Sequence, residues 1–270
     1  MRLERKLALG LLALVFSATI MAGVLSPPSY SQQFRDLPNA PPSRAFPLGT
    51  DELGRSRLSR LLEGTRVSLL LAPAAAVLST LLAGLIGGVA GYLGGWWERL
   101  AMGATDLVLS LPWLFLLLTV RAMLPLNVSP LGSVLITFAL LGLLGWAAAA
   151  RVVCAGARSL RNSDFILRAR AGGGRAGRVL LVHVLPNLKP VLYAQFWISI
   201  PVFILAEANL GILGLGVAEP LPSWGSLLRD LEHCDLRMLT AAPWLLVPLA
   251  LLAVVVTSFQ ILLPTEDFPS

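Results

Sequence analysis

The chain has 270 residues, of which 56% are hydrophobic and only 13% are charged. A soluble domain carries about twice that fraction of charge, so the composition excludes an ordinary soluble enzyme domain. The net charge of +6 does not indicate nucleic-acid binding, because much of it lies in one loop between apolar segments.

Three stretches carry no charged residue: residues 67–97, 122–150 and 238–265. Each is longer than the roughly 20 apolar residues with which a helix crosses a bilayer. Lipid offers the backbone no hydrogen-bond partners, so only helices and closed barrels span it. Strand-type alternation is absent and Leu, Ala and Gly dominate, so we predict an all-α, polytopic membrane protein.

About six transmembrane helices are predicted, over residues 7–25, 67–92, 100–124, 131–150, 191–213 and 239–263. The first follows a basic N-terminus, which is also typical of a secretory signal peptide. We favour a span, because the apolar run is long and no clear cleavage site ends it. The predicted parts are then residues 1–25, an external segment 26–66 with a short interfacial helix at 56–63, a five-helix core 67–265 and a short tail 266–270.

The loop at residues 151–189 fixes the predicted orientation. It carries a single acid, Asp164, against eight basic residues, which are Arg151, Arg158, Arg161, Arg168, Arg170, Arg175, Arg178 and Lys189. Because cytoplasmic loops are enriched in Lys and Arg, we expect this loop and both chain termini to be cytoplasmic.

This basic loop is too long for a simple connection between two helices. Gly172, Gly173 and Gly174 interrupt it between two stretches of helical pattern, and glycine permits the positive φ of a sharp reversal. We therefore predict a helix–turn–helix. A flexible linker, or a charged loop that only sets topology or contacts anionic lipid, remains an alternative. A phosphate-binding loop is excluded, because Arg178 and Val179 stand where Lys and Ser/Thr are required and no strand precedes them.

Charges within the spans are functional candidates, because charge is costly in lipid. Glu207 is predicted either to line a path or to make a structural hydrogen bond with a neighbouring helix. Asp106 is placed near the cytoplasmic end of its span, paired with Arg99. Arg121 is expected to extend to the external surface.

Chemistry at a catalytic or metal site is not indicated. The chain has two histidines, His183 and His233, and no Ser/His/Asp set is visible. His233, Cys234 and Asp235 adjoin one another, but a solvated loop explains them and no metal site is predicted. The topology places Cys154 and Cys234 on opposite sides of the membrane, so no disulfide is expected.

Four motifs in order resemble the inner-membrane permease subunits of ABC importers, in the dipeptide/oligopeptide/nickel branch. They are Phe46-Pro-Leu-Gly-Thr-Asp-Glu-Leu-Gly-Arg-Ser56, Gly91-Tyr-Leu-Gly-Gly-Trp96, Asp106-Leu-Val-Leu-Ser-Leu-Pro112, and the pair Leu205-Ala-Glu-Ala-Asn-Leu-Gly-Ile-Leu-Gly-Leu-Gly216 and Pro220-Leu-Pro-Ser-Trp-Gly225. The resemblance covers nearly the whole chain.

This resemblance implies a type I permease fold in a bacterial inner membrane. It implies a second permease subunit, two ATPase subunits and an extracytoplasmic binding protein that delivers peptides or a related small solute, nickel included. ATP and Mg²⁺ would be held by the ATPases, so no cofactor, no nucleic acid and no enzymatic activity is expected for this chain.

The resemblance also implies site residues. The cytoplasmic loop of the family forms coupling helices that dock on the ATPase, which assigns Asp164, Arg168, Arg170, Gly172, Gly173, Gly174 and Arg175 to that contact. The external motifs assign Gly49, Thr50, Asp51, Gly54, Arg55 and Trp224 to the side facing the binding protein, although packing of these loops on each other would explain them equally.

One departure from the family lies in the coupling loop. Leu167, Arg168 and Ala169 occupy the positions of the family's E-A-A motif, so its glutamate is absent. This departure motivates an alternative: a degenerate, non-transporting scaffold or regulatory subunit of such a complex.

Overall fold

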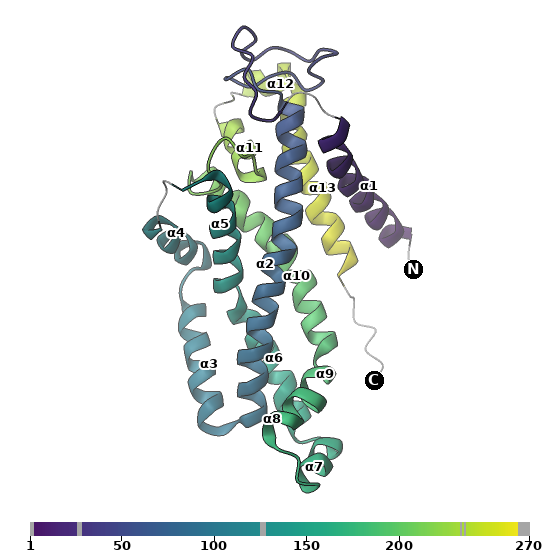
Figure 1. Ribbon diagram of the computed structural model, residues 1–270, viewed down its shortest axis with the longest axis vertical. Coiled ribbons are helices and arrows are strands. Elements are labelled where there is room, and N and C mark those ends of the chain that lie inside the picture. Colours follow the sequence, from purple (N-terminus) through teal and green to yellow (C-terminus); the bar gives the residue numbers. More distant parts are fainter. Residues whose placement is uncertain (1–2, 26–28, 125–127, 233, 235, 264–270) are drawn as a thin grey trace. The chain divides into compact units, whose positions relative to one another are not determined.

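The computed structural model describes residues 3–25, 29–124, 128–232, 234 and 236–263. Across these residues the regular secondary structure is helical, and strand pairing is limited to an isolated bridge between Thr50 and Ser56. The predicted all-α class is confirmed (Figure 1).

The contacts group the chain into two compact units. The first contains Met1–Ala72, Arg121–Phe138 and Pro201–Thr265, and the described residues of the second are Pro73–Val120 and Ala139–Ile200. Several long helices contribute residues to both units.

The first unit holds the helices at the two ends of the chain and a long irregular loop. Helix α1 (Leu3–Leu25) packs along α13 (Val247–Leu262), as Figure 1 shows. Residues 29–56, which we term the loop segment, lead into α2 (Arg57–Leu93). Three short elements precede α13, namely α11 (Trp224–Glu232), α12 (Leu236–Ala241) and the 3₁₀ helix η2 (Pro243–Leu246).

The second unit is built on tight helix packing. Helix α3 (Gly95–Ser110) packs on α6 (Trp146–Arg161). On α2, a Cβ atom at Gly87 or Gly91 would overlap the carbonyl oxygen of Ala150 or Cys154 on α6. Small residues that let helix backbones touch are typical of membrane helix packing.

A helical hairpin follows α6. Its elements are α7 (Asp164–Ala171), α8 (Ala176–Val179), the π-helical turn η1 (Leu180–Val184) and α9 (Leu185–Asn187), after which α10 (Lys189–Ile212) begins. The predicted helix–turn–helix therefore exists, and its reversal lies at the glycines between α7 and α8.

The span predicted over residues 100–124 is wrong as a single helix. It is divided into α3 and α4 (Trp113–Met123), which meet at an angle of 87°. Leu111, which caps α3, is extended with ψ 133°. Pro112 explains this, because a proline disfavours helical backbone in the residue before it.

Two other predicted boundaries differ. Helix α5 (Pro130–Leu144) and α6 together run to Arg161, so the first residues of the basic loop are helical. The short helix predicted at 56–63 is the start of α2 and continues without a break to Leu93. No proline or glycine pair interrupts it there, and Pro73 is accommodated further along.

In the described part of the chain, four helices are long and apolar enough to cross a membrane, or five if α3 and α4 form one bent span. Helix α1 is not among them, so the predicted count of six is not confirmed.

Candidate functional site

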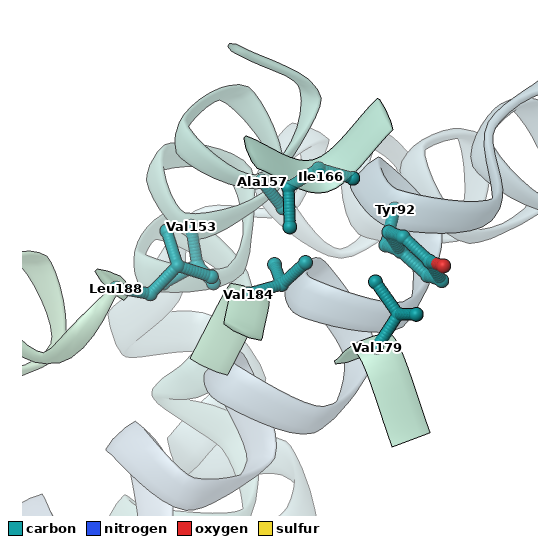
Figure 2. Close-up of a cluster of buried hydrophobic side chains, with 7 residues drawn as sticks. All are labelled: Tyr92, Val153, Ala157, Ile166, Val179, Val184 and Leu188. Carbon is teal, nitrogen blue, oxygen red and sulfur yellow. The ribbon is translucent and has the colours of Figure 1, made fainter. Parts of the chain in front are cut away.

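The hairpin stands on a small apolar core. Ile166 of α7, Val179 of α8 and Val184 of η1 are almost fully buried against the ends of α2, α6 and the turn before α10. Tyr92, Val153, Ala157 and Leu188 complete this cluster (Figure 2). Burying each aliphatic side chain contributes about 1.5–3 kcal/mol, so the hairpin is a folded element and not a flexible linker.

The opposite face of α7 is open. Phe165 is 43% exposed and Leu167 is 49% exposed, beside the exposed Asp164 and Arg168. Sequence reasoning identified the charges of this face but missed its apolar residues. Because they are two residues apart, Phe165 and Leu167 lie on different sides of the helix, with Asp164 and Arg168 between them.

At two of the three predicted positions, Gly173 and Gly174, the backbone conformation or the surrounding space requires glycine. Gly173 adopts φ +79°, and its N–H donates to the Arg170 carbonyl at 3.0 Å. At Gly174, a Cβ would lie 2.7 Å from the Ala169 carbonyl oxygen and 2.9 Å from Val179. Gly172 has an ordinary φ of −74°, and a Cβ there would make only van der Waals contacts, the nearest at 3.5 Å from the Arg168 carbonyl oxygen, so its glycine is not required by the fold.

The other predicted docking residues differ in what they contact. Arg170 donates from Nε to the Tyr92 hydroxyl at 3.3 Å, and its guanidinium lies 4.6 Å from the centre of the Tyr92 ring. Such cation–π contacts stabilise by about 0.5–1 kcal/mol at exposed sites, so Arg170 holds α7 onto α2. Arg175 is exposed and starts α8.

The loop segment is folded around two buried side chains predicted from sequence. The Thr50 hydroxyl accepts from the Ala40 N–H at 2.8 Å and donates to the Leu37 carbonyl at 2.5 Å. The Asp51 carboxylate accepts from the Leu53 and Arg55 N–H groups at 3.0 and 2.8 Å. Asp commonly closes tight turns in this way.

Glycines make this turn possible. Gly49 and Gly54 have φ of +70° and +72°, and a Cβ at either would overlap the backbone of Ala40 or Phe34. All six residues predicted to face the binding protein are buried, Trp224 completely. Their side chains therefore support the loops, which agrees with the alternative that these loops pack on each other, and the assignment of this side to the binding protein stays a prediction.

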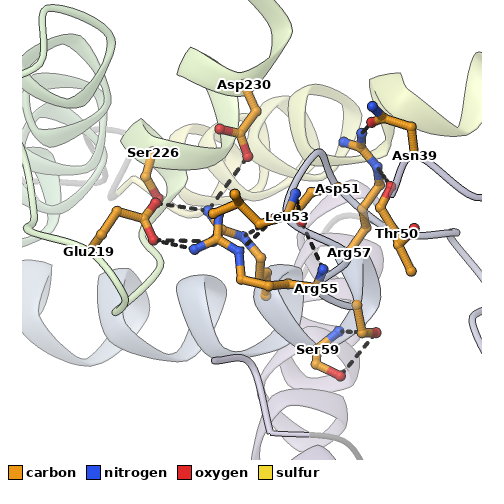
Figure 3. A network of polar contacts seen from close by, with 12 residues as sticks. Asn39, Thr50, Asp51, Leu53, Arg55, Arg57, Ser59, Glu219, Ser226 and Asp230 are labelled. Atoms are coloured by element: carbon orange, nitrogen blue, oxygen red, sulfur yellow. Dashed lines mark hydrogen bonds and ion pairs between the residues drawn. The ribbon is translucent and has the colours of Figure 1, made fainter. Parts of the chain in front are cut away.

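A charged network joins this turn to distant residues (Figure 3). Arg55 donates to Asp51 at 2.7 Å and to Glu219 at 2.5 Å. Arg60, which is 1% exposed, contacts Glu219 at 3.2 Å, Asp230 at 3.5 Å and Asp51 at 3.7 Å. Three carboxylates thus surround two guanidinium groups, which leaves one negative charge in excess.

The two outer carboxyls of the network respond oppositely to it. Burial would raise the pKa of Glu219, but hydrogen bonds and charge from Arg60 and Arg55 outweigh burial and hold that pKa below its usual range. Burial raises the pKa of the Asp230 carboxyl. The charges of Arg60 and Arg57 oppose that shift without cancelling it, and the Glu219 and Asp51 carboxylates add to it.

Glu207 lies on α10 and is fully buried. Ser68 donates to its Oε2 at 3.4 Å, and the Ser223 hydroxyl and the Gly225 N–H are further hydrogen-bond donors to the carboxylate. A Cβ at Gly225 would lie 3.0 Å from Oε1, so the carboxylate adjoins the first turn of α11. Helix N-termini favour negative charge, and the role of Glu207 in a path stays a prediction.

The contact between α10 and α11 explains part of the most specific motif. A Cβ at Gly211 would lie 2.3 Å from Gly225 Cα, and one at Gly216 would lie 2.6 Å from Gly211 Cα. These glycines let the backbones of α10 and α11 touch beside Glu207.

Asp106 pairs with Arg151 of α6, and the predicted pairing with Arg99 is wrong. Glu98 and Arg158 form a second α3–α6 pair at 3.2 Å. Both pairs follow from the packing of α3 on α6, which sequence reasoning did not foresee, because the extension of α6 beyond residue 150 was not predicted.

Arg121 is 2% exposed and does not extend to a surface. Its Nη2 donates to Ser133 at 3.1 Å and to the Gly216 carbonyl at 3.4 Å, and the same Ser133 hydroxyl accepts from the Ala218 N–H. Through these hydrogen bonds, Arg121 connects α4 and α5 to the residues that follow α10.

Metal ligands do not gather in the described part of the chain, where no group of three His, Cys, Asp or Glu side chains could hold an ion. His233 and Asp235, two of the three adjoining residues considered in the sequence, lie outside the described residues.

Taken together, apolar helices of spanning length and a folded hairpin with an exposed basic face define a multi-pass membrane component. The chain belongs to the family of binding-protein-dependent transport system inner membrane components, whose family model matches residues 81–264. Members are membrane parts of transport systems, so the chain is a transport component and not an enzyme.

Curated relatives agree with this assignment. The chain is 32% identical to the dipeptide transport system permease protein DppC of Bacillus subtilis, over 84% of this chain and 70% of the relative. It is 30% identical to the oligopeptide transport system permease protein OppC of the same organism, over 93% and 79%. OppC of Mycobacterium bovis is 32% identical, over 92% and 83%. The resemblance identified from the motifs is confirmed.

Proposed function

We propose that this chain is the transmembrane permease subunit of an ATP-driven importer for peptides or a related small solute, nickel included. The observation that carries the proposal is the match to named dipeptide and oligopeptide permeases over most of the chain. A second permease subunit would complete the path, and an extracytoplasmic binding protein would deliver the solute.

The hairpin is the proposed docking element for the ATPase subunits, which bind and hydrolyse ATP with Mg²⁺. Its apolar core supports α7 in a defined orientation, and Phe165, Leu167 and Arg168 are exposed on α7 around the buried Ile166. Transport requires that this contact differ between inward-open and outward-open states, because coupling between two sites is reciprocal. The chain would lie in a bacterial inner membrane with the hairpin in the cytoplasm.

Leu167 occupies the position where the family's motif has glutamate, so the partner groove is expected to be apolar there. The double variant Phe165→Ser/Leu167→Ser tests this. We expect it to reach the membrane normally but to lose ATPase co-purification and peptide-stimulated ATP hydrolysis in the intact complex. A matched control is Leu181→Ser/Val182→Ser, which removes two exposed apolar side chains of the same hairpin.

The outcomes separate the proposals. Normal ATPase co-purification of the α7 variant would refute docking through α7. It would not refute the proposed transport function. Equal losses in both double variants would indicate a nonspecific apolar surface. ATPase binding by the wild-type complex without any peptide-stimulated hydrolysis or uptake would indicate the alternative, a non-transporting scaffold.

A further inference from the structure

A cavity of about 490 Å³ lies within the first unit, between the loop segment and the segment from α11 to η2. Cavities of about 300–1,000 Å³ are typical of small-molecule sites. Its lining includes the charged residues Glu52, Arg57 and Asp230 and the apolar residues Met238, Trp244 and Leu245. The roles proposed above for the hairpin and for Glu207 do not involve this cavity.

Asp230 is the surplus carboxylate of the charged network. Its side chain is 36% exposed, and its one ion-pair contact is with Arg60 at 3.5 Å. Arg60 is already engaged by both Glu219 oxygens, at 3.2 and 3.3 Å. Within the described residues, the Asp230 carboxylate accepts no hydrogen bond, so it has capacity for a cationic donor.

Arg57 supplies the complementary charge. Its Nε donates to the Thr50 carbonyl at 2.8 Å and its Nη2 to the Asn39 side chain at 3.4 Å. Both acceptors are neutral, and among the described residues no carboxylate lies within ion-pair distance of Arg57. The charge of Arg57 acts on the Asp230 pKa, but within the described residues the two side chains form no ion pair, so both can still bond to a ligand in the cavity that they line.

The fold itself does not account for Asp230. Its raised pKa means that the ionised carboxylate is less favourable in the folded protein than in water. Ionisable groups whose pKa the fold shifts in the unfavourable direction are concentrated at functional sites. Asp230 and Arg57 both have free bonding capacity and face a cavity whose lining also includes apolar residues. A ligand that carries one positive and one negative charge would match them.

We propose that this cavity binds a small zwitterion, an amino acid or a short peptide. Its ammonium group pairs with Asp230, its carboxylate pairs with Arg57, and its apolar part lies against Trp244 and Leu245. The site lies wholly within this chain, and the inference does not depend on the transport function proposed above.

The ligand class is tested with the full chain in lipid nanodiscs, by titration calorimetry with leucine and with glycyl-leucine. We expect saturable binding of at least one, and the tighter of the two shows which source of the zwitterion fits. N-acetyl-glycyl-leucine and glycyl-leucinamide, each lacking one charge, should bind roughly tenfold more weakly or worse. Absence of binding by both zwitterions, or equal binding of the blocked forms, would overturn the proposal.

The location is tested with Asp230→Asn and Arg57→Gln, which should each weaken binding by roughly tenfold. Asp36→Asn and Arg35→Gln change the same charges at exposed positions of the loop segment outside the cavity, and should bind as the wild type does. Asp230→Asn removes one ion pair of Arg60 but leaves Glu219 and Asp51 paired with it, so this variant should fold even if Arg57→Gln disturbs the loop. Wild-type binding by Asp230→Asn would place the site elsewhere and refute the assignment.

Discussion

Arg60 shows how a single residue organises the charged network. Its side chain is 1% exposed and meets carboxylates from the loop segment, from residue 219 and from α11. A buried guanidinium without such partners would cost several kcal/mol. The half-exposed Glu219 contributes most of the compensation, because it contacts both Arg55 and Arg60.

Glu219→Gln is therefore expected to destabilise the folded chain at pH 7 by about 1–2 kcal/mol, the buried-pair value discounted for the exposure of Glu219. The pKa of Glu219 is lowered by folding, so its stabilisation is present above its usual pKa of about 4.3 and is lost as pH falls through the lower folded value. The difference between wild type and variant should accordingly shrink as pH falls below about 4.

Thermal unfolding in detergent at a series of pH values measures this difference. Glu63→Gln is the control, because Glu63 pairs with the exposed Arg66 at 3.7 Å and such surface pairs contribute little. Equal unfolding temperatures for wild type and Glu219→Gln at pH 7 would contradict the proposed role of Glu219.

At the scale of elements, the hairpin depends on how closely α7 and α8 approach. Gly174→Ala is expected to loosen it, because the new Cβ would lie 2.7 Å from the Ala169 carbonyl oxygen. Overpacking of this kind costs about 1–3 kcal/mol. Hydrogen exchange of amides in residues 164–188 should therefore accelerate by roughly tenfold or more.

The matched control is Gly177→Ala on α8, where a Cβ would have nothing within 4 Å. Its exchange rates should equal those of the wild type or be slower, because alanine favours helix over glycine. If both variants exchange alike, the close approach at Gly174 does not hold the hairpin together.

Local signals explain which elements were predictable. The hairpin was predicted because Gly173 and Gly174 are adjacent in sequence and interrupt a helical pattern. The all-α membrane class followed from apolar runs that need no tertiary information. The bend at Pro112 also had a local signal, but the apolar run on both sides of the proline favoured one continuous span.

The charged network had no such signal. Arg60 is 159 residues from Glu219, and no local spacing connects them. Only the pairing of Asp51 with Arg55, four residues apart, is local. For the same reason the burial of Arg121 was missed, since its partner carbonyl at Gly216 is 95 residues away.

For the whole molecule, the number of crossings determines which segments share a side of the membrane. In the described part of the chain four helices qualify as spans, the bent pair α3–α4 is a fifth if it crosses, and α1 is a sixth if it crosses. The hairpin carries four arginines against one acid, Asp164, and this excess of basic charge favours the cytoplasm. If α1, α2, the bent pair and α5–α6 all cross, residue 4 lies on the side of the hairpin and residue 36 on the opposite side.

Single cysteines in a background lacking Cys154 and Cys234 test this arrangement, by labelling with a membrane-impermeant maleimide before and after permeabilisation. We expect Asp36→Cys to react in intact cells, and Glu4→Cys and Arg175→Cys to react only after permeabilisation. All three positions are exposed in the structure, so lack of reaction reports sidedness and not burial.

Each failure identifies a different element. If the bent pair re-enters without crossing, an even number of crossings separates residue 36 from residue 175, and both cysteines react on the same side. If α1 lies against α13 without crossing, Glu4→Cys reacts together with Asp36→Cys, while Arg175→Cys remains on the opposite side. The three labels thus separate the crossing of α1 from that of α3–α4, which apolar length alone does not distinguish.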